Sequence, residues 1–79
     1  MANKEIHELK ILPEYYDLIE KKIKNFEVRY NDRNFNIGDI LYLEEFNLNG
    51  YTGRKLIREI KYILNDDNYC KKGFVILQI

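Results

Sequence analysis

Serine is absent from this chain of 79 residues, and cysteine, histidine and proline each occur once. Without serine, and with His7 as the single histidine, the sequence gives no support to a catalytic triad, and we expect His7 at the surface. Cys70 cannot form an internal disulfide bond, and no cysteine and histidine residues have zinc-site spacing. No apolar run is long enough for a signal peptide or a membrane span. We therefore expect a cytoplasmic protein with no metal site and no cofactor.

Net charge is also missing, because 13 basic residues balance 13 acidic ones. This balance removes the usual whole-protein signal for nucleic-acid or membrane binding, so a local patch would have to hold such a ligand. Seven tyrosines and four phenylalanines, in a chain that is 46% hydrophobic, exclude a disordered polymer. A chain of this length has room for one modest core. We expect a single domain over residues 1–79.

Changes in hydrophobic period divide the chain into short elements. Helical spacing predicts a helix over 14–24 that begins after Pro13, a residue favoured at the first helical position. Strand-like patterns occur at 6–12, 26–33, 40–46 and 74–79. Turns are expected where Asn, Asp and Gly gather, at 31–32, 37–39 and 47–53.

Residues 54–64 fit two patterns. A helical stripe is formed by Leu56, Ile57, Ile60, Ile63 and Leu64. One face of a strand could instead be formed by Leu56, Ile60, Tyr62 and Leu64. Periodicity alone favours a helix here.

The polar face of the predicted strand at 26–33 is the most informative feature. Glu27 and Arg29 are same-face neighbours, so Glu27 can orient the guanidinium of Arg29 toward a phosphate or a base edge. Asn31 adds a donor and an acceptor on the same face, and Arg33 extends it. Taken alone, the pattern fits an ordinary solvated face with weak ion pairs, worth about 0–1 kcal/mol each, better than a binding site.

Other basic and aromatic residues have structural explanations as well as functional ones. The cluster Lys21, Lys22 and Lys24 suits the negative end of the predicted helix, and it could also border a phosphate-binding surface. Tyrosines are good strand residues, and they could also stack on bases; the candidates are Tyr42, Tyr51, Tyr62 and Tyr69. The sequence contains no glycine-rich phosphate loop, metal-ligand spacing or paired catalytic carboxylates.

The order of these motifs resembles the ASCH domain family (activating signal cointegrator homology) of the PUA-like superfamily, in its short bacterial and phage-borne branch. The resemblance covers about Glu5 to Ile79. It rests on His7-Glu8-Leu9-Lys10, Ile11-Leu12-Pro13, Lys24-Asn25-Phe26-Glu27-Val28-Arg29, Asn31-Asp32-Arg33-Asn34-Phe35, Gly38-Asp39 and Tyr51-Thr52-Gly53-Arg54.

The resemblance implies an α+β fold, a small PUA-like β-barrel of about five strands with one main helix after the first strand. It also implies that residues 54–64 form a long strand, against the periodicity. Members of the family have a polar cleft beside the barrel, proposed to take RNA or a nucleotide. Here that cleft would be lined by Lys24, Glu27 and Arg29, with Asn31, Arg33 and Lys10 as neighbours.

A similar branch of the superfamily is an amidohydrolase that removes the acetyl group from N4-acetylcytidine. Its motif pairs a lysine with a threonine three residues later and a distant glutamate. Lys24 matches the lysine, but Glu27 stands at the threonine position, where a hydroxyl nucleophile is needed. The usual family glycine before the lysine is replaced by Lys22.

Three hypotheses follow. The protein binds RNA or a nucleotide in the cleft, with no catalytic residue. Alternatively, it is a small amidohydrolase acting on a modified nucleoside, with Lys24 activating and Glu27 as acid and base. In the third hypothesis it is a protein-interaction domain, in which Lys24, Glu27 and Arg29 pair with one another in a closed cluster without an adjoining pocket. A protein partner and the oligomeric state stay open, and no membrane partner is expected.

Overall fold

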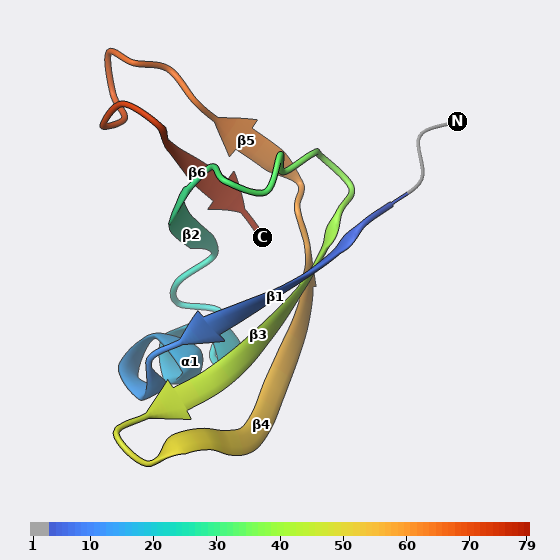
Figure 1. The fold of residues 1–79 in the computed structure, drawn as a ribbon, viewed down its shortest axis with the longest axis vertical. Helices are drawn as coiled ribbons and strands as arrows, with labels where there is room; N and C mark the ends of the chain where they lie inside the picture. The colour runs from blue at the N-terminus through green and yellow to red at the C-terminus, as the bar shows by residue number, and fades with distance from the viewer. Residues whose placement is uncertain (1–3) are drawn as a thin grey trace.

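The computed structural model describes residues 4–79, in which six strands and one short helix are found (Figure 1). In chain order these are β1 (Ile6–Ile11), α1 (Pro13–Glu20), β2 (Phe26–Tyr30), β3 (Ile40–Asn47), β4 (Gly50–Glu59), β5 (Tyr62–Leu64) and β6 (Phe74–Gln78). The fold class is therefore α+β, as expected, and strands make up most of it.

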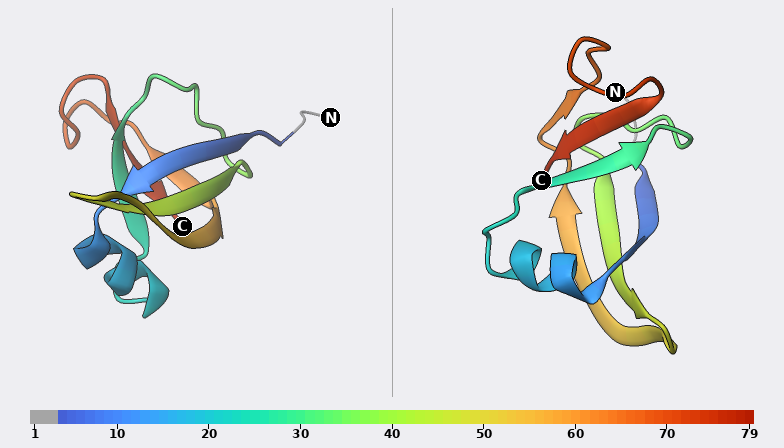
Figure 2. Two further views of the ribbon diagram at one scale, coloured as in Figure 1. Left: turned by 60° about the horizontal axis from the view of Figure 1, so that its bottom comes forward. Right: turned by 90° about the vertical axis from the view of Figure 1, so that its left-hand side faces the viewer.

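The strands form two three-stranded sheets that cross at a steep angle (Figure 2). In the first sheet the order is β1-β3-β4, with β1 parallel to β3 and β3 antiparallel to β4. In the second sheet the order is β2-β6-β5, and both pairs are antiparallel. Over the described residues the pairing yields two open sheets, so the structure shows the class of the fold without showing a closed barrel.

The hydrophobic core lies between the two sheets and is closed at one end by the helix. Alternation along the strands sends every second side chain inward, which is the pattern of a sheet with one covered face. Leu41, Leu43 and Leu77 are completely buried at its centre. The remaining members of the core are Leu9, Ile11, Tyr16, Ile19, Phe35, Ile60, Val75 and Ile79.

Helix α1 begins where the sequence predicts, with Pro13 in its first turn, but it ends at Glu20 and not at residue 24. The chain reverses because Lys22 adopts a left-handed conformation (φ 61°). The N–H groups of Ile23 and Lys24 then return to the carbonyl of Leu18 at 2.9 and 3.0 Å, which satisfies a helix C-terminus. The predicted basic cluster therefore lies beyond the last helical turn. No helix within residues 4–79 is long and apolar enough to cross a membrane.

Residues 54–59 and 62–64 are strand, so the helix favoured by periodicity is wrong. They belong to two strands in different sheets, β4 and β5, and not to one continuous strand. The break falls at Ile60, which is fully buried where the chain passes between the sheets. The backbone of Ile60 donates to Asp39 and accepts from Gly38, at 2.9 and 2.7 Å. The apparent helical stripe arises because Leu56 on β4, Ile60 at the break and Ile63 on β5 all contact one core.

Candidate functional site

Glu27 is the centre of a buried ion cluster on β2. Its side chain is only 6% exposed, which corrects the expectation of a solvated polar face. Its two carboxylate oxygens bind different cations: Lys24 Nζ donates to Oε1 at 2.8 Å, and Arg29 Nε donates to Oε2 at 2.8 Å. Arg29 Nη2 lies 2.6 Å from the same Oε2. Glu27 can be buried because two positive charges compensate for its loss of water.

Two further contacts tie this cluster to the rest of the molecule. Arg29 Nη2 donates to the backbone carbonyl of Lys10 at 2.5 Å, which links β2 to the end of β1 in the other sheet. Lys24 Nζ donates to the carbonyl of Phe26 at 3.0 Å and lies 4.9 Å from the ring centre of Tyr15 on α1. The cluster thus joins both sheets and the helix, so its cations are held in fixed places.

Lys24 and Arg29 each have hydrogen-bond donors that no described residue accepts. Lys24 has three N–H donors, of which Glu27 and Phe26 accept two. Arg29 has five donors, and within the described part of the chain no hydrogen bond is made by its Nη1 atom. Both side chains are partly exposed, at 14% for Lys24 and 26% for Arg29. A ligand can therefore still receive charge-assisted hydrogen bonds from both.

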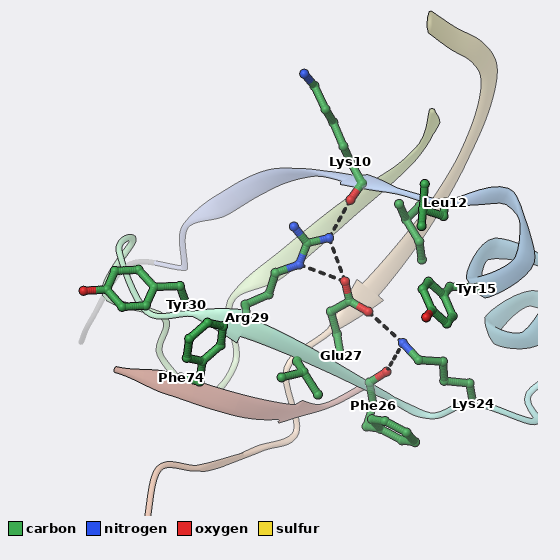
Figure 3. A pocket seen from close by; sticks show the side chains of 11 residues that line it. Lys10, Leu12, Tyr15, Lys24, Phe26, Glu27, Arg29, Tyr30 and Phe74 are labelled. Carbon is green, nitrogen blue, oxygen red and sulfur yellow. Dashed lines mark hydrogen bonds and ion pairs between the residues drawn. The ribbon is translucent and has the colours of Figure 1, made fainter. Parts of the chain in front are cut away.

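A cavity of about 660 Å³ adjoins the cluster, a size common for small-ligand sites. Figure 3 shows Lys24, Phe26 and Tyr15 at one end of it and Tyr30 and Phe74 at the other, with Glu27 and Arg29 between them. Glu27 is the one acidic residue among the described side chains that line it. We name this space the β2 cavity; its lining is completed by Lys10, Ile11, Leu12 and Val28.

The other predicted cleft residues lie elsewhere. The Lys10 side chain points away from Glu27 (Figure 3), toward the rings of Phe46 and Tyr51, so Lys10 serves the cluster through its carbonyl alone. The Asn31 side chain accepts from the Phe35 N–H at 3.2 Å and lines a different cavity of about 640 Å³.

Arg33 is also outside the β2 cavity. Its Nη1 donates to the Glu8 carbonyl at 2.7 Å. It borders a smaller space of about 320 Å³ that Arg29 and Lys10 also line. The structure therefore brings Lys24, Glu27 and Arg29 together, places Arg33 on the far side of Arg29, and separates Asn31 from them.

A second buried glutamate, Glu45 on β3, was not singled out from the sequence. Arg54 donates to it from Nε and Nη2 at 2.9 and 2.7 Å, and the Thr52 hydroxyl donates at 2.6 Å. A register shift between β3 and β4 at this point lets both β4 side chains reach one carboxylate. The hydrogen bonds from Arg54 and Thr52 lower the pKa of Glu45 from 4.5 to about 2. The sequence signal was the run Tyr51-Thr52-Gly53-Arg54, which served only for the family resemblance.

His7 is buried, so its expected surface position is wrong. Its Nε2 lies 2.9 Å from Asp39 Oδ2, and its ring meets the edge of Phe35 at 4.8 Å between centroids. Burial alone would raise the pKa of Asp39. Hydrogen bonds from His7 and from the backbone N–H groups of Glu5 and Asn36 outweigh it and lower that pKa. This pair fixes the loop before β3 and does not line the β2 cavity. No group of three potential metal-ligating side chains exists within residues 4–79.

Fold and site together define a small α+β protein with a cation-lined, partly aromatic cavity at a sheet edge. A family model described as "Domain of unknown function (DUF3850)" matches residues 6–79, so the chain belongs to this family. A curated relative, the "Uncharacterized 12.9 kDa protein in GpA 3'region" of Escherichia phage P2, is 43% identical over 51 residues. The aligned part is 65% of this chain and 47% of the phage protein, so the match spans about half of that relative. The resemblance to ASCH domains stays a prediction.

Proposed function

We propose that this protein binds RNA or a nucleotide in the β2 cavity. The observation that carries the proposal is the wall formed by Lys24, Glu27 and Arg29, whose cations are fixed in place yet keep donors for a ligand. The interaction-domain hypothesis expected a closed cluster without a pocket. Lys24, Glu27 and Arg29 do pair with one another, as that hypothesis expected. The hypothesis also expected no adjoining pocket, whereas the β2 cavity adjoins the cluster.

The wall suits an anionic ligand with a flat ring system. Arg29 Nη1 and the third Lys24 donor supply charge-assisted hydrogen bonds to phosphate oxygens or to a base edge. Phe26, Tyr15 and Leu12 supply apolar surface for a base. Glu27 orients both cations through its two oxygens. Arg33 extends the positive surface beyond the cavity, because it borders the neighbouring space that Arg29 also lines.

The family resemblance supports the same function. We propose that the two sheets are the parts of a PUA-like barrel of the ASCH type, with α1 packed at its side as the resemblance implies. In that arrangement the residues Lys24, Glu27 and Arg29 occupy the family's proposed RNA cleft. We also propose that the protein acts in the cytoplasm, where RNA and nucleotides are present.

Hydrolysis of a modified nucleoside stays the second candidate, because Lys24 Nζ and Glu27 Oε1 lie 2.8 Å apart and both residues line the cavity. The chain has one threonine, Thr52, and its hydroxyl is bound to Glu45 in the other cluster. Among the described residues, no serine or threonine hydroxyl therefore lines the β2 cavity. The aliphatic hydroxyl nucleophile that the amidohydrolase motif uses has no counterpart there, which favours binding over catalysis.

Amide-shift NMR titration with single-stranded RNA, mononucleotides and N4-acetylcytidine tests both candidates. We expect shifts at residues 24–30, and we expect Arg29→Gln to weaken binding roughly 10- to 150-fold by removing a charge-assisted hydrogen bond. The matched control is Arg58→Gln, because Arg58 also donates to backbone carbonyls but does not line the cavity. The absence of shifts with every ligand, or an equal loss in the control, contradicts the binding proposal. A time-dependent change in the nucleoside's own signals would instead support hydrolysis.

A further inference from the structure

The second sheet exposes the apolar side of β2. Phe26, Val28 and Tyr30 are 46, 50 and 58% exposed, whereas Glu27 between them is buried. In a two-sheet fold the apolar side of a strand normally faces the core. Strand β2 is reversed because its inward side is occupied by the ion cluster of Lys24, Glu27 and Arg29.

Strand register makes this exposed side continuous. Tyr30 lies opposite Phe74, with ring centroids 5.5 Å apart in an edge-to-face arrangement. Val28 lies opposite Ile76, and Phe26 shares its row with Gln78 and Tyr62. We call this surface the outer face; its apolar members are Phe26, Val28, Tyr30, Tyr62, Phe74 and Ile76. Apolar surface gathered in this way on a small protein marks a contact site.

Positive charge borders the outer face at both ends. Lys24 Nζ lies 5.0 Å from the ring centre of Phe26, and Lys71 Nζ lies 5.7 Å from that of Phe74. Tyr30 and Phe74 also line the β2 cavity, in which Glu27 is the one acid among the described lining residues and is already neutralised. The outer face is thus continuous with a site whose charge complements phosphate.

We propose that the outer face is a second subsite, where bases of a single-stranded nucleic acid stack on Tyr30 and Phe74 as the strand leaves the β2 cavity. This inference rests on the proposed function and specifies its ligand as a single strand longer than one nucleotide. Aromatic side chains beside cations are the usual means of holding unpaired bases. Bases within a duplex are stacked on one another and cannot use such a surface.

The geometry also predicts a dependence on length. Phe26 and Tyr30 are four residues apart on a strand, which separates the two ends of the surface by about 13 Å. A mononucleotide bound at Lys24 and Arg29 fills the cavity end. Reaching Tyr30 and Phe74 at the other end requires further nucleotides (Figure 3).

Binding of uridine monophosphate and of a uridine hexanucleotide to the wild type, Tyr30→Leu and Tyr51→Leu proteins tests the inference. Tyr51 is the matched control: it is also 58% exposed and packs edge-to-face on a phenylalanine, Phe46, at 5.1 Å, but it does not line the β2 cavity. We expect the hexanucleotide to bind the wild type more tightly than the monophosphate. Tyr30→Leu should weaken hexanucleotide binding roughly 5- to 150-fold, and it should weaken monophosphate binding by a smaller factor, because the monophosphate binds at the opposite end of the cavity. Tyr51→Leu should change neither.

The failures of the two proposals are distinguishable. Equal affinity of the wild type for both ligands, together with no effect of Tyr30→Leu, overturns the second subsite and leaves the cavity proposal standing. No binding of either ligand overturns both. If sedimentation shows that the wild type self-associates and Tyr30→Leu is monomeric, the outer face is a contact between two copies and the inference is wrong. Phe74→Leu provides a second variant in which the same loss of hexanucleotide affinity is expected.

Discussion

Two buried glutamates, Glu27 and Glu45, are each neutralised by arginine, but only one of them adjoins a large cavity. Arg54 and Thr52 saturate Glu45, and the Arg54 guanidinium also stacks on Tyr16 at 4.3 Å and donates to Asp17 at 3.1 Å. The space beside this cluster measures about 170 Å³. The β2 cavity beside Glu27 measures about 660 Å³.

The difference separates a structural cluster from the cluster that we propose binds a ligand. Arg54 donates from Nε and Nη2 to Glu45 and from Nη2 to Asp17, so the Glu45 cluster links the β4 hairpin to α1. Lys24 and Arg29 share Glu27, keep donors that no described residue accepts, and both line the β2 cavity. Neither a satisfied carboxylate nor a spare donor identifies a functional site by itself, because both glutamates are paired and the Nη1 atoms of Arg54 and Arg29 alike make no hydrogen bond among the described residues. The size of the adjoining cavity distinguishes the two clusters.

Arg54→Ala should cause the largest loss of unfolding free energy among the changes considered. It leaves Glu45 buried with Thr52 as its remaining side-chain partner, and it removes the contacts with Tyr16 and Asp17. Arg54→Lys should recover part of the loss, because lysine keeps the charge but not the two-pronged geometry. Urea unfolding measures both. A loss no larger than that of Arg58→Ala would show that the Glu45 cluster does not stabilise the fold.

Acid should remove the contribution that the Glu45 carboxylate makes to the unfolding free energy. Its folded pKa of about 2 lies below the ordinary value of 4.5, so its stabilisation is complete above pH 4.5 and is lost as the pH falls toward 2. Asp39, whose pKa is also lowered, acts in the same direction. Unfolding free energy should therefore fall over this range, and less steeply in Glu45→Gln. Carbon-detected NMR of the Glu45 carboxyl group gives an independent check, and a midpoint near 4.5 would contradict the prediction.

Glu27→Gln should have opposite effects on stability and on ligand binding. Loss of two charge-assisted hydrogen bonds should cost about 1–3 kcal/mol of unfolding free energy. Binding of a mononucleotide should become tighter, because Lys24 and Arg29 are no longer neutralised. Glu45→Gln is the control, since it should destabilise the fold without changing affinity. Weaker binding by Glu27→Gln would mean that Glu27 matters for affinity by orienting Lys24 and Arg29 or by contacting the ligand, and not by neutralising their charge. Loss of nucleoside turnover would favour hydrolysis.

Local patterns in the sequence predict β1, β2, β3, β6 and the start of the helix, because hydrophobic alternation and a proline at the first turn act over a few residues. The end of the helix was missed because it depends on the left-handed conformation of Lys22. The stripe at 54–64 was misjudged because Leu56 and Ile63 pack against one core from two different sheets.

Burial of the candidate site could not be predicted from the strand alone. The alternation of Glu27 and Arg29 with apolar residues fits either orientation of β2. The orientation is decided by partners outside the strand, Lys24 after the helix and the Lys10 carbonyl on β1. Glu45 was missed for a similar reason, since a shift in register brings Arg54 to it from nine residues away.

Gly73 lies beside Tyr30 of the outer face, and Gly53 lies beside the Glu45 cluster. The difference in unfolding free energy between alanine variants at these two positions isolates the cost of displacing the Tyr30 ring. Gly73 and Gly53 both have positive φ, 84° and 93°, so alanine at either position costs about 1–2 kcal/mol of backbone strain. A Cβ at Gly53 meets open space, whereas one at Gly73 would lie 2.5 Å from the Tyr30 ring. Gly73→Ala should therefore cost about 0.5–1.5 kcal/mol more than Gly53→Ala, because the ring must leave its rotamer. If Tyr30 stacks a base, only Gly73→Ala should also weaken hexanucleotide binding. Equal unfolding free energies for the two variants would show that the ring moves freely and is not held as a platform.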